Sequence, residues 1–193
     1  STVASSSLIK SLCEYHSIPF HETKIGFKYF TPFLKYADSK NELCFGVESS
    51  GGFSVSTHTY DKCGFLPILL IIGIMKKTNN TLSTLSKNID STYGHYAFIE
   101  DELPIASTIN IAGLLLEKHT NNTLHEYFNT TITSIDSTDG IKLIFSPNDW
   151  VLCRSSGTEP VLRLYAESLT RSCALNYIDS IKKLISEHIR SRP

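Results

Sequence analysis

The chain has 193 residues, of which 41% are hydrophobic and 19% are charged, and its formal net charge is -1 at pH 7. These values are typical of a globular protein and leave room for one large domain or two small ones. Because neither sign of charge dominates, the composition argues against nucleic acid or an anionic membrane as the main partner.

Cysteine usage and hydropathy narrow the class further. The 5 cysteines include no CxxC pair, which disfavours a disulfide framework or a zinc site and favours reduced thiols in the cytoplasm. The apolar run at 65–75 is too short for a bilayer, which needs about 20 residues, so we predict a buried helix with Pro67 in its first turn. The chain begins at Ser1 rather than at a methionine, so we expect a fragment or a processed product.

The first half of the chain alternates between helical and extended patterns. Serines ahead of Leu8 and Ile9 can cap a helix, and N-E-L-C-F-G-V-E at 41–48 is typical of a strand that ends in a glycine-rich loop. The expected elements are helices over 5–16, 26–36, 65–75 and 81–89, strands over 19–23 and 41–48, and a loop over 58–64. This order predicts an α/β domain over residues 1–103.

The pattern changes near 100–104, where we place a domain boundary. A helix over about 107–118 is followed by extended segments, and T-D-G (138–140) and S-P-N-D (146–149) are turn signals between them. The apolar stripe of a C-terminal helix comprises Ala174, Tyr177, Ile178, Ile181, Leu184, Ile185 and Ile189. Residues 104–193 are therefore predicted to form a smaller α+β domain, an antiparallel sheet packed with helices.

Four loops hold most of the unusual polar residues. They are G-F-K-Y (26–29), E-S-S-G-G (48–52), H-T-Y-D-K-C-G (58–64) and R-S-S-G-T-E-P (154–160). A carboxylate can accept hydrogen bonds from paired sugar hydroxyls, and a serine can both donate and accept. Arginine, hydroxyls and free backbone N–H groups suit a phosphate dianion, because charge-assisted hydrogen bonds are the strong ones. The loops together indicate a ligand with hydroxyls at one end and a phosphate at the other.

Each loop also has a simpler interpretation. R-S-S-G-T-E-P can be a decorated turn, and E-S-S-G-G can be a turn that ends a strand. Lys62 can be a helix-start residue, His58 a surface histidine and Lys28 a solvated helix residue. The D-S-T-D-G segment (136–140) faintly resembles a metal loop, but a hairpin turn accounts for it and we assign it no metal.

In this order, the four loops resemble the C-terminal half, domains 3 and 4, of the α-D-phosphohexomutases, the phosphoglucomutase/phosphomannomutase family. The segment 21–30 is similar to the family's E-T-x-x-G-F-K-Y, and F-G-V-E-S-S-G-G-F (45–53) is similar to its sugar-binding loop F-G-x-E-x-S-G-G. Residues 58–64 resemble H-x-x-x-K-D-G, and R-S-S-G-T-E-P resembles the phosphate loop R-P-S-G-T-E-P. The resemblance covers nearly the whole chain.

The resemblance implies roles for particular residues. Family members move phosphate between O1 and O6 of a hexose through a phosphoserine, a magnesium site and a bisphosphorylated sugar that turns around in the cleft. Glu48 and Ser50 match the positions that read sugar hydroxyls, His58 and Lys62 match positions lining the site, and Lys28 matches a further motif position. The residues that match the phosphate loop are Arg154, Ser155, Ser156, Gly157 and Thr158.

The chain departs from the family pattern in two ways. Ser49, Cys63 and Ser155 stand where the family has Glu, Asp and Pro, so the start of the helix at 65 and the phosphate loop are expected to be less firmly held. The T-A-S-H-N-P serine loop and the D-G-D-G-D metal loop are absent from this sequence. The resemblance therefore implies a chain that does not catalyse phosphoryl transfer alone, with Mg²⁺ and its site in the full-length enzyme and hexose 1,6-bisphosphate as activator and intermediate.

Three functions remain open at this point. The first is half of a cytoplasmic phosphoglucomutase/phosphomannomutase, whose partners are a hexose phosphate and the missing N-terminal half, with no nucleic acid and no membrane. The second is a stand-alone module that binds sugar phosphate without chemistry. The third is a glucosamine-phosphate mutase, a branch that tends to carry Gln in the sugar loop, where this chain has Glu48-Ser49-Ser50.

Overall fold

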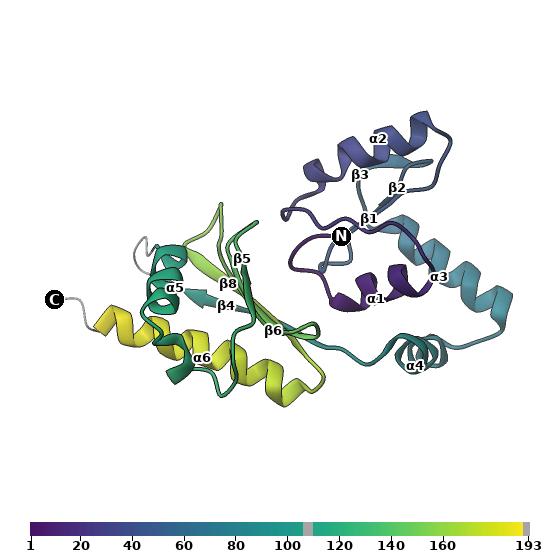
Figure 1. Cartoon of the computed structure of the whole chain (residues 1–193). Coiled ribbons are helices and arrows are strands. Elements are labelled where there is room, and N and C mark those ends of the chain that lie inside the picture. The colour runs from purple at the N-terminus through teal and green to yellow at the C-terminus, as the bar shows by residue number, and fades with distance from the viewer. Residues whose placement is uncertain (106–109, 191–193) are drawn as a thin grey trace. The chain divides into compact units, whose positions relative to one another are not determined.

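The computed structural model describes residues 1–105 and 110–190, which form two compact units, Ser1–His95 and Tyr96–Pro193 (Figure 1). The units divide ahead of the expected boundary at 103/104. Strand β4 (Ala97–Pro104) accounts for the difference, because it pairs along its whole length with β8 (Val161–Ser168) of the second unit. Its acidic E-D-E centre gave the strand little apolar signal in the sequence.

The first unit combines helices with a three-stranded antiparallel sheet of order β1-β2-β3. Its elements are α1 (Ser7–Tyr15), η1 (Phe27–Tyr29), α2 (Thr31–Ser39), β1 (Phe45–Val47), β2 (Phe53–Val55), β3 (Thr59–Cys63), α3 (Phe65–Thr78) and α4 (Leu82–Tyr93). The serine cap is confirmed, since Ser6 Oγ accepts a hydrogen bond from the Leu8 amide at 3.2 Å.

Two local predictions for the first unit are wrong. The segment 19–23 forms only an isolated parallel bridge between Thr2 and Thr23 instead of a strand. The expected loop at 58–64 contains strand β3, which pairs with β2 through Phe53↔Cys63 and Val55↔Thr59. A polar T-Y-D-K-C strand carries no hydrophobic alternation, because both of its faces keep solvent contact.

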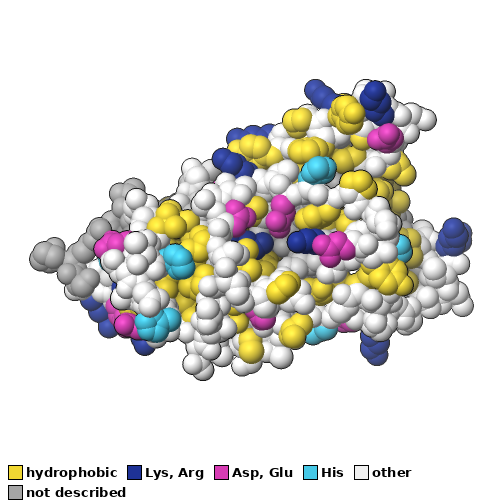
Figure 2. Space-filling model, in the orientation of Figure 1, with side chains coloured by type: hydrophobic (Ala, Val, Ile, Leu, Met, Phe, Trp, Pro, Cys, Tyr) yellow, Lys and Arg dark blue, Asp and Glu magenta, His cyan; other side chains and the backbone are white. Residues whose placement is uncertain are grey.

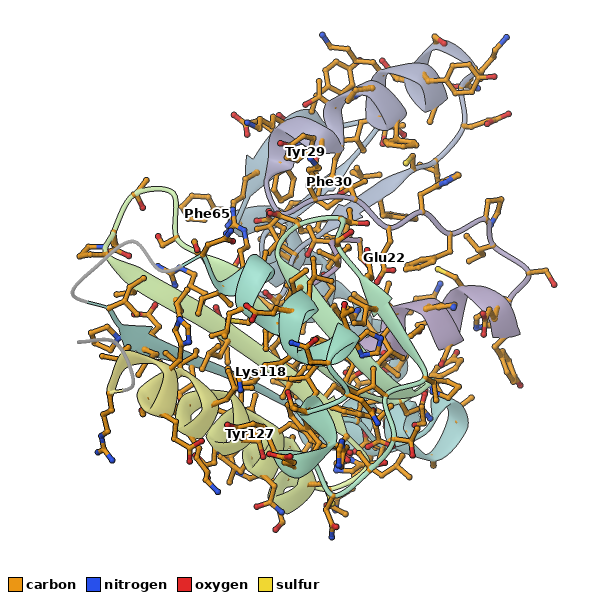
Figure 3. All side chains as sticks on the ribbon, turned by 60° about the vertical axis from the view of Figure 1, so that its left-hand side comes forward. Glu22, Tyr29, Phe30, Phe65, Lys118 and Tyr127 are labelled. Atoms are coloured by element: carbon orange, nitrogen blue, oxygen red, sulfur yellow. The ribbon has the colours of Figure 1, made fainter. Side chains whose placement is uncertain are left out.

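Helix α3 forms with Pro67 in its first turn, but the prediction that it is buried is wrong. Phe65, labelled in Figure 3, is 80% exposed, and Ile68 and Leu69 are 55% and 66% exposed. Hydrophobic side chains are accordingly visible on the surface of the first unit (Figure 2). The apolar run predicts burial only where neighbours are available, and α3 makes its main contacts with α4 and β2. Within the described part of the chain, no helix has both the length and the apolar content needed to cross a membrane.

The second unit is a five-stranded antiparallel sheet of order β4-β8-β7-β6-β5 with helices against it. Its other elements are α5 (Ile111–Thr120), η2 (Leu124–Glu126), β5 (Ser134–Asp136), β6 (Ile141–Ser146), β7 (Asp149–Ser155) and α6 (Arg171–Arg190). The turns at 138–140 and 146–149 are confirmed as the joints of the β5–β6 and β6–β7 hairpins. The first residues of the expected 107–118 helix lie outside the described residues, and α5 follows them.

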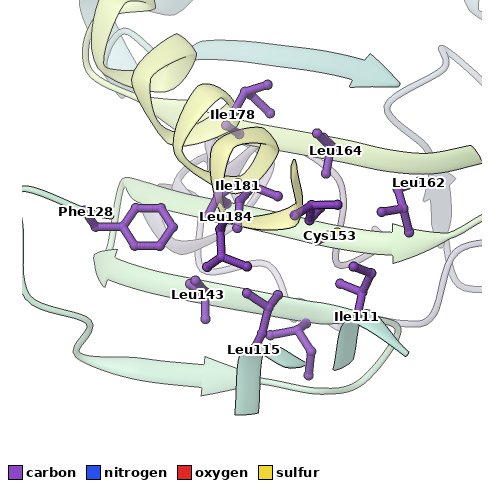
Figure 4. Packing of buried hydrophobic residues seen from close by; sticks show 14 of the residues in the cluster. Ile111, Leu115, Phe128, Leu143, Cys153, Leu162, Leu164, Ile178, Ile181 and Leu184 are labelled. Atoms are coloured by element: carbon purple, nitrogen blue, oxygen red, sulfur yellow. The ribbon is translucent and has the colours of Figure 1, made fainter. Parts of the chain in front are cut away.

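The core of the second unit lies between α5, α6 and one face of the sheet. Ile178, Ile181 and Leu184 of α6 pack over the strands, as Figure 4 shows, and all three are fully buried. Val151 and Cys153 of β7 belong to the same cluster. The predicted stripe of α6 is confirmed except at Ile189, which is exposed near the end of the helix. The fold class is thus the mixed α/β and α+β arrangement that the sequence predicted.

Candidate functional site

Three of the predicted loops meet at Glu48 within the first unit. Lys62 Nζ lies 3.0 Å from Glu48 Oε2 and donates to Ser50 Oγ at 2.9 Å. The other oxygen of Glu48, Oε1, accepts a hydrogen bond from the Gly26 amide at 3.0 Å. Because Glu48 is only 10% exposed and Lys62 is 47% exposed, the carboxylate is the fixed member of the pair and the ammonium is the accessible one.

The β1–β2 hairpin holds this group in place. Glu48 directly follows β1, and its backbone amide donates to the carbonyl of Gly52 at 3.0 Å, so that the E-S-S-G-G segment closes as a tight turn. The stem of Lys62 crosses directly over Gly52, where an added Cβ would collide with the Lys62 side chain. The missing side chain at Gly52 therefore leaves room for the lysine stem, which brings the ammonium of Lys62 from β3 to Ser50.

The other two residues predicted for this site lie outside the group. Lys28 is exposed in η1, and its Nζ lies 5.1 Å from the ring centroid of Tyr29, a cation–π contact. His58 is exposed in the turn between β2 and β3, where its amide donates to the carbonyl of Val55 at 3.0 Å. That turn is the opposite end of the β2–β3 hairpin from Lys62.

The arginine of the predicted phosphate loop stands at the end of β7 in the second unit. Arg154 Nε donates to Asp139 Oδ1 at 3.0 Å, and both side chains are partly buried. Ser155 continues the strand, paired with Leu162 of β8. Position 155 therefore stays paired in the strand ladder although it is a serine. The loosening of the phosphate loop that we expect from this serine is confined to the residues after the strand.

The loop beyond β7 is exposed and only lightly held. Ser156 Oγ accepts from the amides of Thr158 and Glu159 at 3.4 and 3.3 Å, which are long for N–H···O bonds. A Cβ at Gly157 would meet nothing within 4 Å, so the space beside this residue is open. These amides can turn toward an anion at little cost.

Four charged residues around Arg154 were not assigned to the site from the sequence. Arg163 of β8 is the cross-strand partner of Arg154, and Glu102 and Glu159 neutralise it. Asp139 neutralises Arg154 from the β5–β6 turn. The T-D-G turn signal marked Asp139 as a turn residue, and only the strand register, which one sequence does not fix, puts it beside the arginine.

Burial and nearby charges shift the pKa values of the neighbouring Tyr165 and Cys153. Burial raises the pKa of Tyr165, Glu100 raises it further, and the nearby Arg163 and Arg154 oppose the shift. Burial in the apolar core raises the pKa of Cys153 to about 12, so that this thiol is a packing residue. Among the described residues, no cluster of three His, Cys, Asp or Glu side chains could hold a metal ion.

Comparison with known proteins now identifies the family. Residues 1–93 match the sequence profile described as phosphoglucomutase/phosphomannomutase, alpha/beta/alpha domain III. Residues 119–183 match the profile of the C-terminal domain of the same family. The chain belongs to the phosphoglucomutase/phosphomannomutase family.

Similar members of the phosphoglucomutase/phosphomannomutase family cover most of this chain. A phosphoglucosamine/phosphogalactosamine mutase of Sulfurisphaera tokodaii is 28% identical over 95% of the chain and 37% of its own length. A phosphoglucomutase/phosphomannomutase of Thermococcus kodakarensis is 27% identical over 98% of the chain and 38% of its own length. The chain thus spans less than two fifths of these two relatives.

The fold is also that of the phosphoglucomutase/phosphomannomutase family. A protein of Thermus thermophilus, provisionally assigned as a phosphomannomutase, superposes with a TM-score of 0.70 at 22% identity. The match covers 96% of this chain and 35% of that chain. The profiles and this likeness together confirm the resemblance that the four loops carry.

Proposed function

We propose that this chain is the sugar- and phosphate-binding half of a phosphohexomutase that interconverts hexose 1-phosphate and hexose 6-phosphate. The observation that carries the proposal is the convergence of Glu48 and Ser50 of one loop with Lys62 of another. A carboxylate, a hydroxyl and an ammonium within hydrogen-bond distance offer both acceptors and donors to a pair of vicinal sugar hydroxyls. A purely structural ion pair would not need the exposed hydroxyl of Ser50.

The proposed division of work follows from the chemistry of each group. Glu48 accepts from sugar hydroxyls while Lys62 and Ser50 donate, and Lys28 and His58 line the approach. Arg154 and the hydroxyls and amides of 155–158 hold the phosphate that is not being transferred, because hydrogen bonds to a charged phosphate are stronger than those between neutral groups. One unit that binds a hydroxyl pair and another that binds a phosphate supply the two kinds of contact that a reaction through hexose 1,6-bisphosphate requires.

The remaining parts of the proposal concern what lies outside this chain. We propose that the phosphoserine and the Mg²⁺ site belong to the part of the relatives that this chain does not span. Bound Mg²⁺ would supply charge stabilisation to the transferring phosphoryl group. The chain alone is then inactive as a mutase, its partner is that N-terminal half, and the intact enzyme works in the cytoplasm.

A stand-alone module that binds sugar phosphate without chemistry is the second candidate. It is favoured by the contacts of Lys62 with Glu48 and Ser50, which are complete within this chain. The two candidates make the same prediction for binding by this chain. They differ in whether adding the N-terminal half of a relative restores mutase activity.

The binding test is a titration of this chain with glucose 1-phosphate, glucose 6-phosphate, mannose 6-phosphate and glucosamine 6-phosphate, followed by NMR or calorimetry. We expect Arg154→Ala to lose about 1.5–3 kcal/mol of binding free energy, the range for a hydrogen bond to a charged group. That loss corresponds to an increase in Kd of about 10- to 150-fold. Lys62→Met should weaken the binding of every sugar phosphate but leave the binding of inorganic phosphate unchanged.

The matched control is Arg171→Ala. Arg171 carries the same charge in the same unit, but it is exposed at the start of α6, beyond the opposite end of β8 from the phosphate loop. Arg171→Ala should bind like the wild type. Equal losses in both arginine variants would mean that net charge, rather than the loop, governs binding, and absence of binding by the wild type at millimolar ligand would refute binding by the chain alone.

A further inference from the structure

The turn between β5 and β6 packs directly against the arginine of the phosphate loop. Asp139 Oδ1 accepts from Arg154 Nε at 3.0 Å. The register of the β6–β7 pair, in which Ile141 lies opposite Cys153, brings the end of this turn next to Arg154. The phosphate-loop arginine is therefore held by a segment that is remote from the loop in sequence.

The turn is built to keep Asp139 in one place. Gly140 has a φ of +90°, and a Cβ there would lie 2.5 Å from the Cys153 carbonyl oxygen and 2.9 Å from Arg154 Cβ. At the other side of the turn, the Thr138 amide donates to Asp136 Oδ1 at 2.8 Å, which fixes the backbone ahead of Asp139. The carboxylate thus rests on a turn that has little freedom to move.

The contact at Nε has a directional consequence. A guanidinium is planar and carries its other N–H donors on the η nitrogens, which point away from Nε. A carboxylate that occupies Nε fixes the plane of the group and leaves the η edge as the part that can grip a phosphate with two parallel hydrogen bonds. The same carboxylate also lowers the local positive charge, which would weaken the binding of an anion if charge alone mattered.

The charges on the adjacent strand do not replace Asp139. Arg163 faces Arg154 across the β7–β8 pair, and like charges in that position repel. Glu102 and Glu159 both pair with Arg163. The ion pair of Arg154 is with Asp139, so this carboxylate both offsets the repulsion and sets the direction of the side chain.

We propose that Asp139 is a positioning residue of the phosphate site, which orients Arg154 so that its η nitrogens face the bound phosphate. This inference rests on the proposed function, because it assigns Asp139 a part in the same binding loop. It makes a prediction opposite to that of simple electrostatics. Removing a negative charge beside an anion site should tighten binding, whereas removing a positioning group should weaken it.

The test compares Asp139→Ala, Asp139→Asn and the control Glu102→Ala in this chain. Glu102 lies in β4, outside the phosphate loop, and pairs with Arg163, so its loss removes one negative charge without touching the Asp139–Arg154 contact. The probes are inorganic phosphate and glucose 6-phosphate, titrated by NMR on the amides of Gly157 and Thr158. The Arg154 Nε–H resonance in the free protein reports the contact itself, independently of ligand.

We expect Asp139→Ala to raise the Kd for both probes roughly two- to fivefold, the range for a partly exposed ion pair, and to expose Arg154 Nε–H to fast solvent exchange. Asp139→Asn keeps an oxygen that can accept from Nε and should restore binding to the wild-type value or better. Glu102→Ala should bind no more weakly than the wild type. Phosphate bound as tightly by Asp139→Ala as by the wild type, or an unprotected Nε–H in the wild type, overturns the positioning role and leaves the proposed function intact. Failure of the wild type to bind either probe overturns phosphate binding by this chain, the part of the proposed function on which the inference rests.

Discussion

The sharpest single substitution is Gly140→Ala in the β5–β6 turn. The residue has a φ of +90°, and an alanine there incurs about 1–2 kcal/mol for a left-handed backbone. Its Cβ would also meet the Cys153 carbonyl oxygen at 2.5 Å and Arg154 Cβ at 2.9 Å. Neither neighbour can rotate away, since one is backbone and the other is fixed to it, and overpacking of this kind costs about 1–3 kcal/mol. We expect a loss of about 2–5 kcal/mol from the free energy of unfolding of the second unit.

Urea denaturation followed by the fluorescence of Trp150 measures that loss. Trp150 is the only tryptophan of the chain and is buried in β7, so its emission reports the second unit alone. Gly157→Ala is the matched control, because its Cβ would meet nothing within 4 Å and its effect should stay within about 0.5 kcal/mol. A Gly140→Ala variant as stable as this control would show that the turn is free to shift, which would contradict the fixed placement of Asp139.

Two further predictions concern pH and the exposed helix. The hydrogen bond from Lys182, 2.6 Å away, lowers the pKa of Asp101 below 3.8. The pair therefore stabilises the folded state fully above about that pH. This stabilisation is lost as the pH falls through the lower folded-state pKa of Asp101. Asp101→Asn should therefore lower the urea midpoint of Trp150 fluorescence at pH 7 and differ progressively less from the wild type as the pH falls below 3.8; a difference that does not shrink as the pH is lowered would contradict this. In α3, the combined change Ile68→Gln, Leu69→Gln and Ile72→Gln should reduce binding of the dye ANS while keeping the far-ultraviolet circular dichroism, because it removes exposed apolar surface. Unchanged dye binding would place the hydrophobic surface elsewhere.

Much of the second unit could be predicted because its signals are local. The apolar stripe of α6 and the turn residues at 138–140 and 146–149 each specify one element without help from the rest of the chain. Strand β4 was missed because its centre is acidic, and its place in the sheet depends on eight-residue pairing with β8. Pairing between distant segments leaves no mark in either segment alone.

The first unit shows the opposite limit. Helix α3 was predicted correctly as a helix, yet its burial depends on which neighbours surround it. An apolar sequence indicates only a preference for burial. The loop motifs predicted the meeting of Glu48, Ser50 and Lys62, while Lys28 and His58 lie outside that group. The acid beside Arg154 could not be predicted, since strand register decides which turn residue becomes its neighbour.

Strand β7 sets the side of the sheet on which the phosphate-loop arginine stands. Val151 and Cys153 point into the core beneath the helices, so Arg154, the next residue along, points to the other face. Insertion or deletion of one residue between Asp149 and Arg154 would turn the Arg154 guanidinium toward the apolar core and the Cys153 thiol toward the opposite face. In lineages that descend from this protein, the spacing of the segment should consequently be preserved more strictly than its composition, and length changes should collect in the loops at either end.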